Sequence, residues 1–396
     1  MATGRATVTA SPLEIRAVRA VRSAAPTTVL ALGVFAAVRG LGVLVLALGS
    51  LWAGRDPMRV LGSSWDSVWY LGIAANGYGR TQMWPDAVTG TGYIQSDYAF
   101  FPLFPALMRA VSAVLPGGLI PAGILIAWVC AAVAALGVYR IGERVIGPRA
   151  GLLLVGLWAA LPHSVVLSLA YTEPLLAALA AWALYALLRG RWMWAAGLAV
   201  LAGLTRPTGL AVAAAVSAMA LYTILVRRSR APEVWAAGLL APAGWAAYVL
   251  AVGIHVRDPL GGYFTVQRRW GSRFDFGVGA LRSAERVLTG GHVPLATTVT
   301  VVLLAAAGLL ALLLFLDRTP LPLLAYTAIL LVITYGGAGF FESKPRFLLP
   351  AFPLLLPVAA VMARARPRTA VLVTAGLAGL SYGYGLYLML VARVPL

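Results

Sequence analysis

The chain has 396 residues, of which 61% are hydrophobic and only 11% are charged. A soluble domain carries about 25% charged residues, so this composition excludes a soluble globular protein. The net charge of +18 does not indicate nucleic acid as a partner, because the basic residues are scattered between apolar runs and form no single patch. Apolar runs recur along most of the chain and predict one polytopic, all-α membrane domain.

Residues 1–25 are polar and precede a long apolar run without an obvious cleavage site. This arrangement predicts a cytoplasmic N-terminal tail and a retained first helix, followed by a single transmembrane domain over residues 26–392. The apolar runs predict about eleven spans. Their approximate ranges are 26–50, 118–139, 150–169, 174–188, 194–205, 207–226, 233–254, 295–316, 320–337, 346–362 and 369–391.

The distribution of arginines supports this assignment through the positive-inside rule. Arginines occupy the tail and the connections that follow every even-numbered span. Those connections contain Arg140, Arg144 and Arg149, then Arg189 and Arg191, then Arg227, Arg228 and Arg230, then Arg318, and finally Arg364, Arg366 and Arg368. The parity predicts a cytoplasmic N-terminus, an outer C-terminus and two long outer segments, 51–117 and 255–294.

In the first outer segment, Trp65, Trp69 and Ile73 recur at helical spacing, and Asp66 and Tyr70 lie one turn apart beside them. This pattern predicts an amphipathic helix at the membrane interface, with its aromatic residues at headgroup depth. Asp66 is either a functional acid or a helix-start residue, since acids favour the first turn of a helix.

Residues 98–115 are apolar enough to be counted as a further span, but this would reverse the arginine parity. The segment also contains Pro102, Pro105 and Arg109, so we interpret it as an interfacial or re-entrant helix. Asp97, just before it, is either a cap or loop residue or a second-tier site residue.

Residues 194–226 have arginines at both ends, so this stretch must enter the membrane and return. The break falls at Thr205-Arg206-Pro207, with Pro207 in the first turn of a new helix and Thr205 as a possible cap. Arg206 would then lie partway into the membrane, where a cation needs a partner. That partner is either a phosphate, which the guanidinium fork suits, or a carboxylate such as Glu173 at a nearby outer turn.

Two further basic stretches lie on the predicted outer side. Gln267, Arg269 and Trp270 belong to the second outer segment, which binds either anionic lipid headgroups or a lipid-linked phosphate. Lys344, the only lysine of the chain, stands close to Arg346 at another outer turn. These two side chains either anchor a helix end or bind phosphate.

Metal and cysteine chemistry are not expected. The sequence has no zinc-protease, Cys/His-cluster or phosphate-loop motif, and His163, His255 and His292 are far apart. Cys130 is the only cysteine, so no intrachain disulfide can form.

Several strings carry a resemblance to a known family. WDSVWYLGIAANGY, followed by AFFPLFP, resembles the PIG-V-like mannosyltransferases of the GT-C glycosyltransferase class. AYTEP, LTRPTG and KPRFLLPAFP are similar to that family in the same order, as is QRRWGSR in the second outer segment. The resemblance covers most of residues 30–360.

The resemblance implies a GT-C-like bundle with amphipathic juxtamembrane helices and a large first outer loop that bears a catalytic acid. The acid corresponds to Asp66. The implied donor is a sugar, usually mannose, on a polyprenyl phosphate, with no cofactor or metal. The TRPTG string differs from the Arg-Ser/Asn-Gly-like string of eukaryotic members, which leaves the role of Arg206 open. Eukaryotic members act on a glycolipid anchor. That acceptor is not expected here, because the Arg, Ala and Gly usage indicates a GC-rich genome and an actinobacterial origin.

The resulting hypothesis is an inverting hexosyltransferase in the cell membrane, working on its outer face with Asp66 as general base. Its partners would be the polyprenyl-phosphate-linked donor, membrane lipids and a hydroxyl acceptor on a lipid, glycan or protein. The residues expected to bind the donor or support the site are Arg206, Lys344, Arg346, Arg269, Gln267, Trp270, Tyr70, Asp97 and Glu173.

Two other functions stay open at this point. A transporter or flippase of a lipid-linked sugar would need charges at mid-membrane depth, for which Arg39 is the candidate, and inverted repeats. A non-catalytic lipid-binding scaffold would not bring Asp66 and Arg206 to one cavity.

Overall fold

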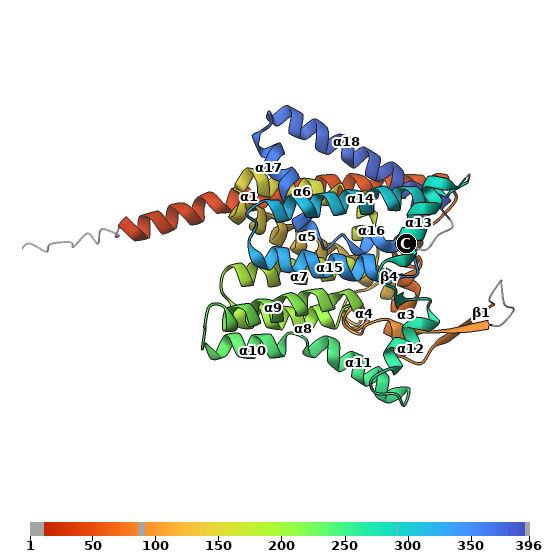
Figure 1. Ribbon diagram of the computed structural model, residues 1–396. Helices are drawn as coiled ribbons and strands as arrows, with labels where there is room; N and C mark the ends of the chain where they lie inside the picture. Colours follow the sequence, from red (N-terminus) through yellow and green to blue (C-terminus); the bar gives the residue numbers. More distant parts are fainter. Residues whose placement is uncertain (1–11, 86–91, 291, 393–396) are drawn as a thin grey trace, which may run out of the picture.

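The computed structural model describes residues 12–85, 92–290 and 292–392. Its helices run side by side as a bundle, and short helices and two small two-stranded sheets gather at one end (Figure 1). The longest helices are α1 (Pro12–Trp52), α5 (Leu119–Val145), α14 (Leu295–Leu316) and α18 (Pro367–Leu386). The shorter bundle helices are α6 (Pro148–Ala159), α7 (Glu173–Leu188), α8 (Trp192–Gly203), α9 (Leu210–Leu225), α10 (Pro232–Leu240), α11 (Ala243–His255), α15 (Leu321–Gly336) and α17 (Leu356–Arg364).

The remaining elements are short. They are α2 (Pro57–Gly62), α3 (Asp66–Asn76), α4 (Leu103–Ser112), α12 (Gly262–Arg269), α13 (Val278–Thr289) and α16 (Lys344–Phe347), with strands β1 (Thr81–Pro85), β2 (Gly92–Ser96), β3 (Arg273–Phe274) and β4 (Gly337–Ala338). β1 pairs antiparallel with β2, and β3 with β4. Single 3₁₀ turns are η1 (Asp97–Ala99), η2 (Ser164–Ser168), η3 (Pro207–Gly209), η4 (Phe341–Ser343) and η5 (Phe352–Leu355), and a π-helical turn η6 (Tyr387–Val391) follows α18.

The prediction of an all-α polytopic membrane protein is confirmed. Within the described residues, six helical segments are long and apolar enough to cross a bilayer, or seven if one bent pair counts as a span. The six are Thr27–Trp52, Leu119–Val145, Pro207–Leu225, Pro232–His255, Leu295–Leu316 and Pro367–Val391. Shorter apolar helices such as α7 and α8 account for other predicted spans, so the number of eleven crossings stays a prediction.

Two predicted spans are not continuous helices. The span expected over 150–169 is helical only to Ala159, because Pro162 lacks an N–H and disfavours helical backbone at the residue before it. The segment 160–172 that follows is non-helical apart from η2. The span expected over 346–362 is broken between Phe347 and Phe352, and its two halves meet at 76°.

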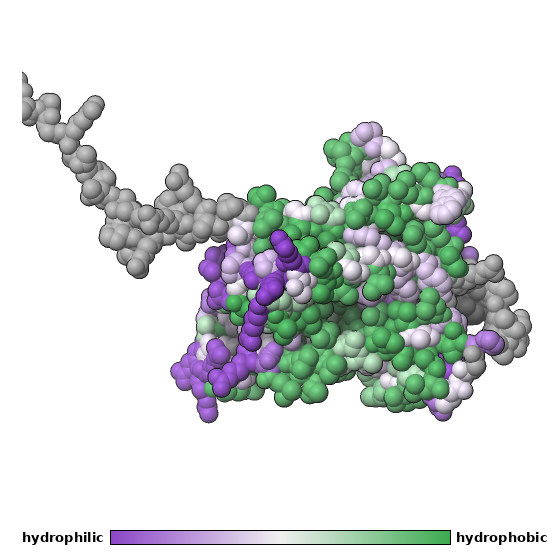
Figure 2. All heavy atoms as spheres, turned by 90° about the horizontal axis from the view of Figure 1, so that it is seen from above, coloured by the Kyte–Doolittle hydropathy of each residue, from purple (hydrophilic) through white to green (hydrophobic). Residues whose placement is uncertain are grey.

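The connections between helices fit the arginine parity. The α9–α10 and α14–α15 turns lie at the same end of the bundle as the beginning of α1 (Figure 1). Hydrophilic residues gather at that end, and hydrophobic residues cover the middle of the face shown in Figure 2. The tail residues 1–11 lie outside the described residues.

Small residues let the central helices approach closely. α5 packs against both α6 and α7. A Cβ added at Gly142 of α5 would lie 2.7 Å from the Cα of Gly151 in α6, so both positions need glycine. Close packing of this kind is typical of membrane helices, because lipid offers no hydrophobic gain on association. The result is a tight α5–α6–α7 layer beside α1.

The short elements partly agree with the sequence. The helix predicted around Asp66 is confirmed as α3, but most of its apolar stripe packs against the protein. Trp69 and Ile73 are buried in the protein, and only Trp65 is well exposed. α4 has ten residues and is about 15 Å long, half of the hydrocarbon thickness, which agrees with a non-spanning segment over 98–115.

Candidate active site

Asp66 is the first residue of α3, where the chain turns sharply into the helix. Trp65, just before it, has φ of +51°, and a positive φ is uncommon for residues other than glycine. Such backbone is concentrated at functional sites. The Asp66 N–H donates to the hydroxyl of Tyr171 at 3.2 Å, so the start of α3 is tied to the non-helical segment before α7.

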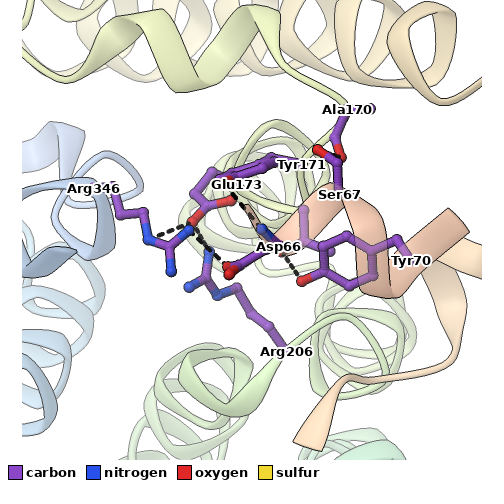
Figure 3. Close-up of polar contacts among 9 residues, drawn as sticks. Asp66, Ser67, Tyr70, Ala170, Tyr171, Glu173, Arg206 and Arg346 are labelled. Carbon is purple, nitrogen blue, oxygen red and sulfur yellow. Dashed lines mark hydrogen bonds and ion pairs between the residues drawn. The ribbon is translucent and has the colours of Figure 1, made fainter. Parts of the chain in front are cut away.

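Four charged side chains meet next to this turn. Oδ2 of Asp66 lies 2.7 Å from Nη1 of Arg346, and Nε of Arg346 lies 3.6 Å from Oε1 of Glu173. Glu173 also forms an ion pair with Arg206. Figure 3 shows the guanidinium groups of Arg346 and Arg206 reaching toward the two carboxylates from different parts of the fold. We call these four residues the ion cluster.

The ion cluster confirms one of the two partners considered for Arg206, the internal pair with Glu173. Arg206 follows α8, and Pro207 opens the next helical segment as expected. Thr205 is not the cap, which corrects the sequence expectation, because its hydroxyl donates back to the Leu201 carbonyl at 2.8 Å.

Aromatic rings cover the guanidinium groups. The guanidinium carbon of Arg346 lies 5.4 Å from the Tyr171 ring centroid and 5.1 Å from that of Phe347. The guanidinium carbon of Arg206 lies 5.0 Å from the ring centroid of the same Phe347. Cation–π contacts of this kind favour a cation in a place where water is scarce.

Hydrogen bonds set the register between α3 and the segment before α7. Ser67 donates its hydroxyl to the Ala170 carbonyl at 3.1 Å, and the hydroxyls of Tyr70 and Thr172 lie 3.2 Å apart. Together with the Tyr171 contact, these bonds fix the Asp66 carboxylate beside Glu173. Ser67, Thr172 and Tyr171 were missed as site residues in the sequence, although their strings were singled out.

The accessible member of the ion cluster is Asp66. Its side chain is 24% exposed, against 1% for Glu173 and 7% for Arg346. Burial raises the pKa of the Asp66 carboxyl above its ordinary value, and the nearby Arg346 offsets part of that rise. A carboxylate with these properties can reach a substrate and accept a proton.

Lys344 lies outside the ion cluster, although it is only two residues from Arg346. Its ammonium donates to the carbonyls of Thr334 and Gly337 at the end of α15. Of the two roles considered in the sequence, this contact corresponds to anchoring a helix end.

Asp97 is also occupied elsewhere. Its carboxylate accepts backbone N–H groups of Gly79 and Arg80 at 2.9–3.1 Å, and the residue is 1% exposed. Asp97 is therefore a buried acceptor for the loop between α3 and β1, not a solvated residue.

The second outer segment packs beside α3 without reaching the ion cluster. The Trp270 ring meets the Trp69 ring edge-on at 5.0 Å, and its indole N–H donates to the Ser96 carbonyl at 2.9 Å. Gln267 donates to the Ala99 carbonyl at 3.2 Å. Arg269 is exposed. Within the described residues, no group of three or more His, Cys, Asp or Glu side chains is placed to hold a metal ion.

The comparison with known proteins rests on structure. No family model matches the chain, and no curated protein matches it in sequence. ArnT from Cupriavidus metallidurans, in a crystal structure bound to undecaprenyl phosphate, is similar with a TM-score of 0.51 and 16% identity. The match covers 86% of this chain and 64% of that chain. The fold is GT-C-like.

A second similar structure is the apo form of the Archaeoglobus fulgidus oligosaccharyltransferase, with a TM-score of 0.48 and 14% identity, over 90% of this chain and 56% of that one. The chain thus spans less than two thirds of the length of both proteins. In this GT-C-like chain, the ion cluster lies among the short elements at the end of the bundle where α1 finishes.

Proposed function

We propose that the chain is an inverting glycosyltransferase that moves a sugar from a polyprenyl-phosphate carrier to a hydroxyl acceptor on the extracytoplasmic face. The observation that carries this proposal is the Asp66 carboxylate, part exposed, at the edge of a buried pair of guanidinium groups. The GT-C-like fold supports it, and the crystal structure of ArnT contains undecaprenyl phosphate. Mannose is proposed as the sugar on the resemblance to PIG-V-like enzymes.

The proposed reaction needs one base and one anion site. Asp66 accepts the proton of the acceptor hydroxyl, whose oxygen attacks the anomeric carbon on the face opposite the phosphate. The bond between that carbon and the phosphate oxygen breaks, and the carrier leaves as a polyprenyl phosphate. Base catalysis contributes about 10²–10⁴-fold. Because inversion occurs in one displacement, no second carboxylate is needed as a nucleophile.

The leaving phosphate gains charge, which Arg346 and Arg206 would stabilise. Preorganised cations in a dry site stabilise developing charge strongly. Glu173, fully buried and in contact with both guanidiniums, would hold them in place. These contacts favour Glu173 as a residue that orients the two arginines over one that touches the acceptor.

The alternative functions receive less support. A non-catalytic scaffold would not bring Asp66 and Arg206 together, whereas Glu173 and Arg346 join them in the ion cluster. A flippase would need a row of charges at mid-membrane depth. Arg39 is such a charge, but it is held by serines of a neighbouring segment.

The decisive experiment uses membranes that contain the full chain. They are incubated with polyprenyl-phosphate-mannose labelled in the sugar, alongside polyprenyl-phosphate donors of other hexoses. We expect a labelled product with wild-type protein, and a rate of product formation that is lower by about 10²-fold or more with Asp66→Asn. The anomeric configuration of the product should be opposite to that of the donor. Full activity of purified Asp66→Asn protein would overturn the assignment.

A further inference from the structure

Arg39 is a buried arginine in the middle of α1, and it does not belong to the ion cluster. Arg39 is 6% exposed. Its Nη1 donates to the Ser164 hydroxyl at 2.8 Å, and its Nη2 donates to the Ser168 hydroxyl at 2.7 Å. Nη1 also lies 3.5 Å from the Ala159 carbonyl oxygen. Among the described residues, no carboxylate pairs with Arg39.

An unpaired cation at membrane depth is expensive and marks a functional candidate. Here the guanidinium holds η2, whose first and last residues are Ser164 and Ser168. η2 is part of the non-helical segment 160–172 inside the bundle, where backbone polar groups need partners from the protein. Ser381 of α18 is a further partner of this segment, because its hydroxyl donates to the Leu161 carbonyl at 2.7 Å. The segment is thus fixed from α1 and α18 together.

The same segment continues directly into the candidate active site. Ala170 donates its N–H to the Leu61 carbonyl at 2.9 Å and accepts from Ser67 through its own carbonyl. Tyr171 accepts the Asp66 N–H, and Glu173 begins α7 in contact with both arginines of the ion cluster. One short stretch of chain therefore joins the Arg39 guanidinium to the groups that surround Asp66.

We propose that Arg39 is a positioning residue, which fixes η2 from the membrane interior and thereby sets Tyr171 and Glu173 relative to Asp66. The hydrogen bonds of Arg39 go to Ala159, Ser164 and Ser168, so it would act on Asp66 only through the segment 160–173. The kinetic part of this inference rests on the proposed glycosyl transfer. A misplacement of about 1 Å in reacting groups costs about 10²-fold in rate, so loss of this support should lower kcat more than substrate binding.

The first test compares Arg39→Met with wild type in purified, detergent-solubilised protein. We expect kcat to fall at least about tenfold, while KM for the polyprenyl-phosphate-sugar changes less than about threefold. The matched control is Arg149→Met, because Arg149 also donates to a backbone carbonyl, that of Ala365, but at the opposite end of α6 from the segment 160–173. Its kcat should stay within about twofold of wild type. A folded Arg39→Met protein with unchanged kcat would overturn the proposal.

A second variant keeps the test decisive if Arg39→Met does not fold. Ser164→Ala/Ser168→Ala removes the two hydroxyl acceptors and leaves the cation in place. We expect a similar fall in kcat. If Arg39→Met folds, the combined triple variant should be no worse than Arg39→Met by more than about twofold, because both changes break the same link. The inference would be contradicted if the losses in kcat of the two variants multiplied in the triple variant. A double alanine variant with wild-type kcat would also contradict it.

A readout independent of transfer separates this inference from the proposed function. Amide hydrogen exchange should rise in peptides covering 160–173 and 61–70 in Arg39→Met but not in Arg149→Met. If wild-type protein transfers no sugar and this pattern is still seen, the proposed function fails and the positioning role stands. Unchanged exchange in both peptides would remove the positioning role itself.

Discussion

Arg346 and Asp66 form an ion pair at 2.7 Å although they come from opposite ends of the chain. Asp66 begins α3 near the N-terminus, and Arg346 lies in α16, just before the break between Phe347 and Phe352. Because the same guanidinium also approaches Glu173, the cation is shared between an accessible carboxylate and a buried one. A substrate phosphate could therefore draw on Arg346 while Glu173 keeps it in place.

Removing the Asp66 charge should slow transfer strongly without unfolding the protein. Asp66→Asn keeps the side-chain size and leaves Arg346 close to Glu173, so we expect kcat to fall by about 10²–10⁴-fold. The control is Asp56→Asn in the same outer segment, where the exposed carboxylate caps α2 and lies 3.8 Å from Arg59. Its kcat should equal that of wild type. Equal losses in the two variants would argue against a specific role for Asp66.

The activity should depend on the ionisation of Asp66. Burial raises the pKa of Asp66 above 3.8, in spite of the opposing effect of Arg346. The base must be ionised to accept a proton, so kcat/KM should fall as the pH drops through this raised pKa. A pH profile of kcat/KM measures the midpoint of the acid limb. The residual turnover of Asp66→Asn should lack that limb, and a midpoint at or below 3.8 would contradict the assignment.

The membrane class and the α3 helix could be predicted from the sequence, because composition and helical spacing are local properties. The Thr205-Arg206-Pro207 break was predictable for the same reason, since proline opens a helix at its first turn. The non-helical stretch after Ala159 was not, because its apolar residues look like a span. It is stabilised there by tertiary contacts of its polar groups, among them those with Arg39 and Ser381, which local sequence does not reveal.

The residues of the candidate site could be predicted from the sequence, but most of the contacts between them could not. Asp66, Glu173, Arg206 and Arg346 were all candidates in the sequence and all meet in the ion cluster. Lys344 looked equivalent to Arg346 but points to the end of α15. Two residues apart on one short turn, these side chains face different partners, and sequence spacing alone does not say which one faces the site.

The buried carboxylate of the ion cluster, Glu173, should matter mainly for the stability of the fold. In Glu173→Gln, Asp66 is the one carboxylate of the ion cluster that remains for Arg206 and Arg346. Breaking a buried ion pair in this way lowers the free energy of unfolding by about 3–5 kcal/mol. Glu143→Gln is the contrast, because its pair with Arg140 at 3.0 Å is about 30% exposed and is worth about 0–1 kcal/mol. Denaturant titrations of both proteins in detergent measure the free energies of unfolding. Similar losses would show that Glu173 is not the structural centre of the cluster.

Lys344 and Arg346 should separate stability from activity. Lys344→Met removes the ammonium from the carbonyls of Thr334 and Gly337, so the free energy of unfolding should fall by about 1–3 kcal/mol. Its kcat should stay within about threefold of wild type, because the ion cluster is intact. Arg346→Met should lose about 10²–10³-fold in kcat, as expected for a donor aimed at developing charge. Both quantities are measured on the same preparations, and an inactive Lys344→Met with normal stability would instead place Lys344 at the donor phosphate.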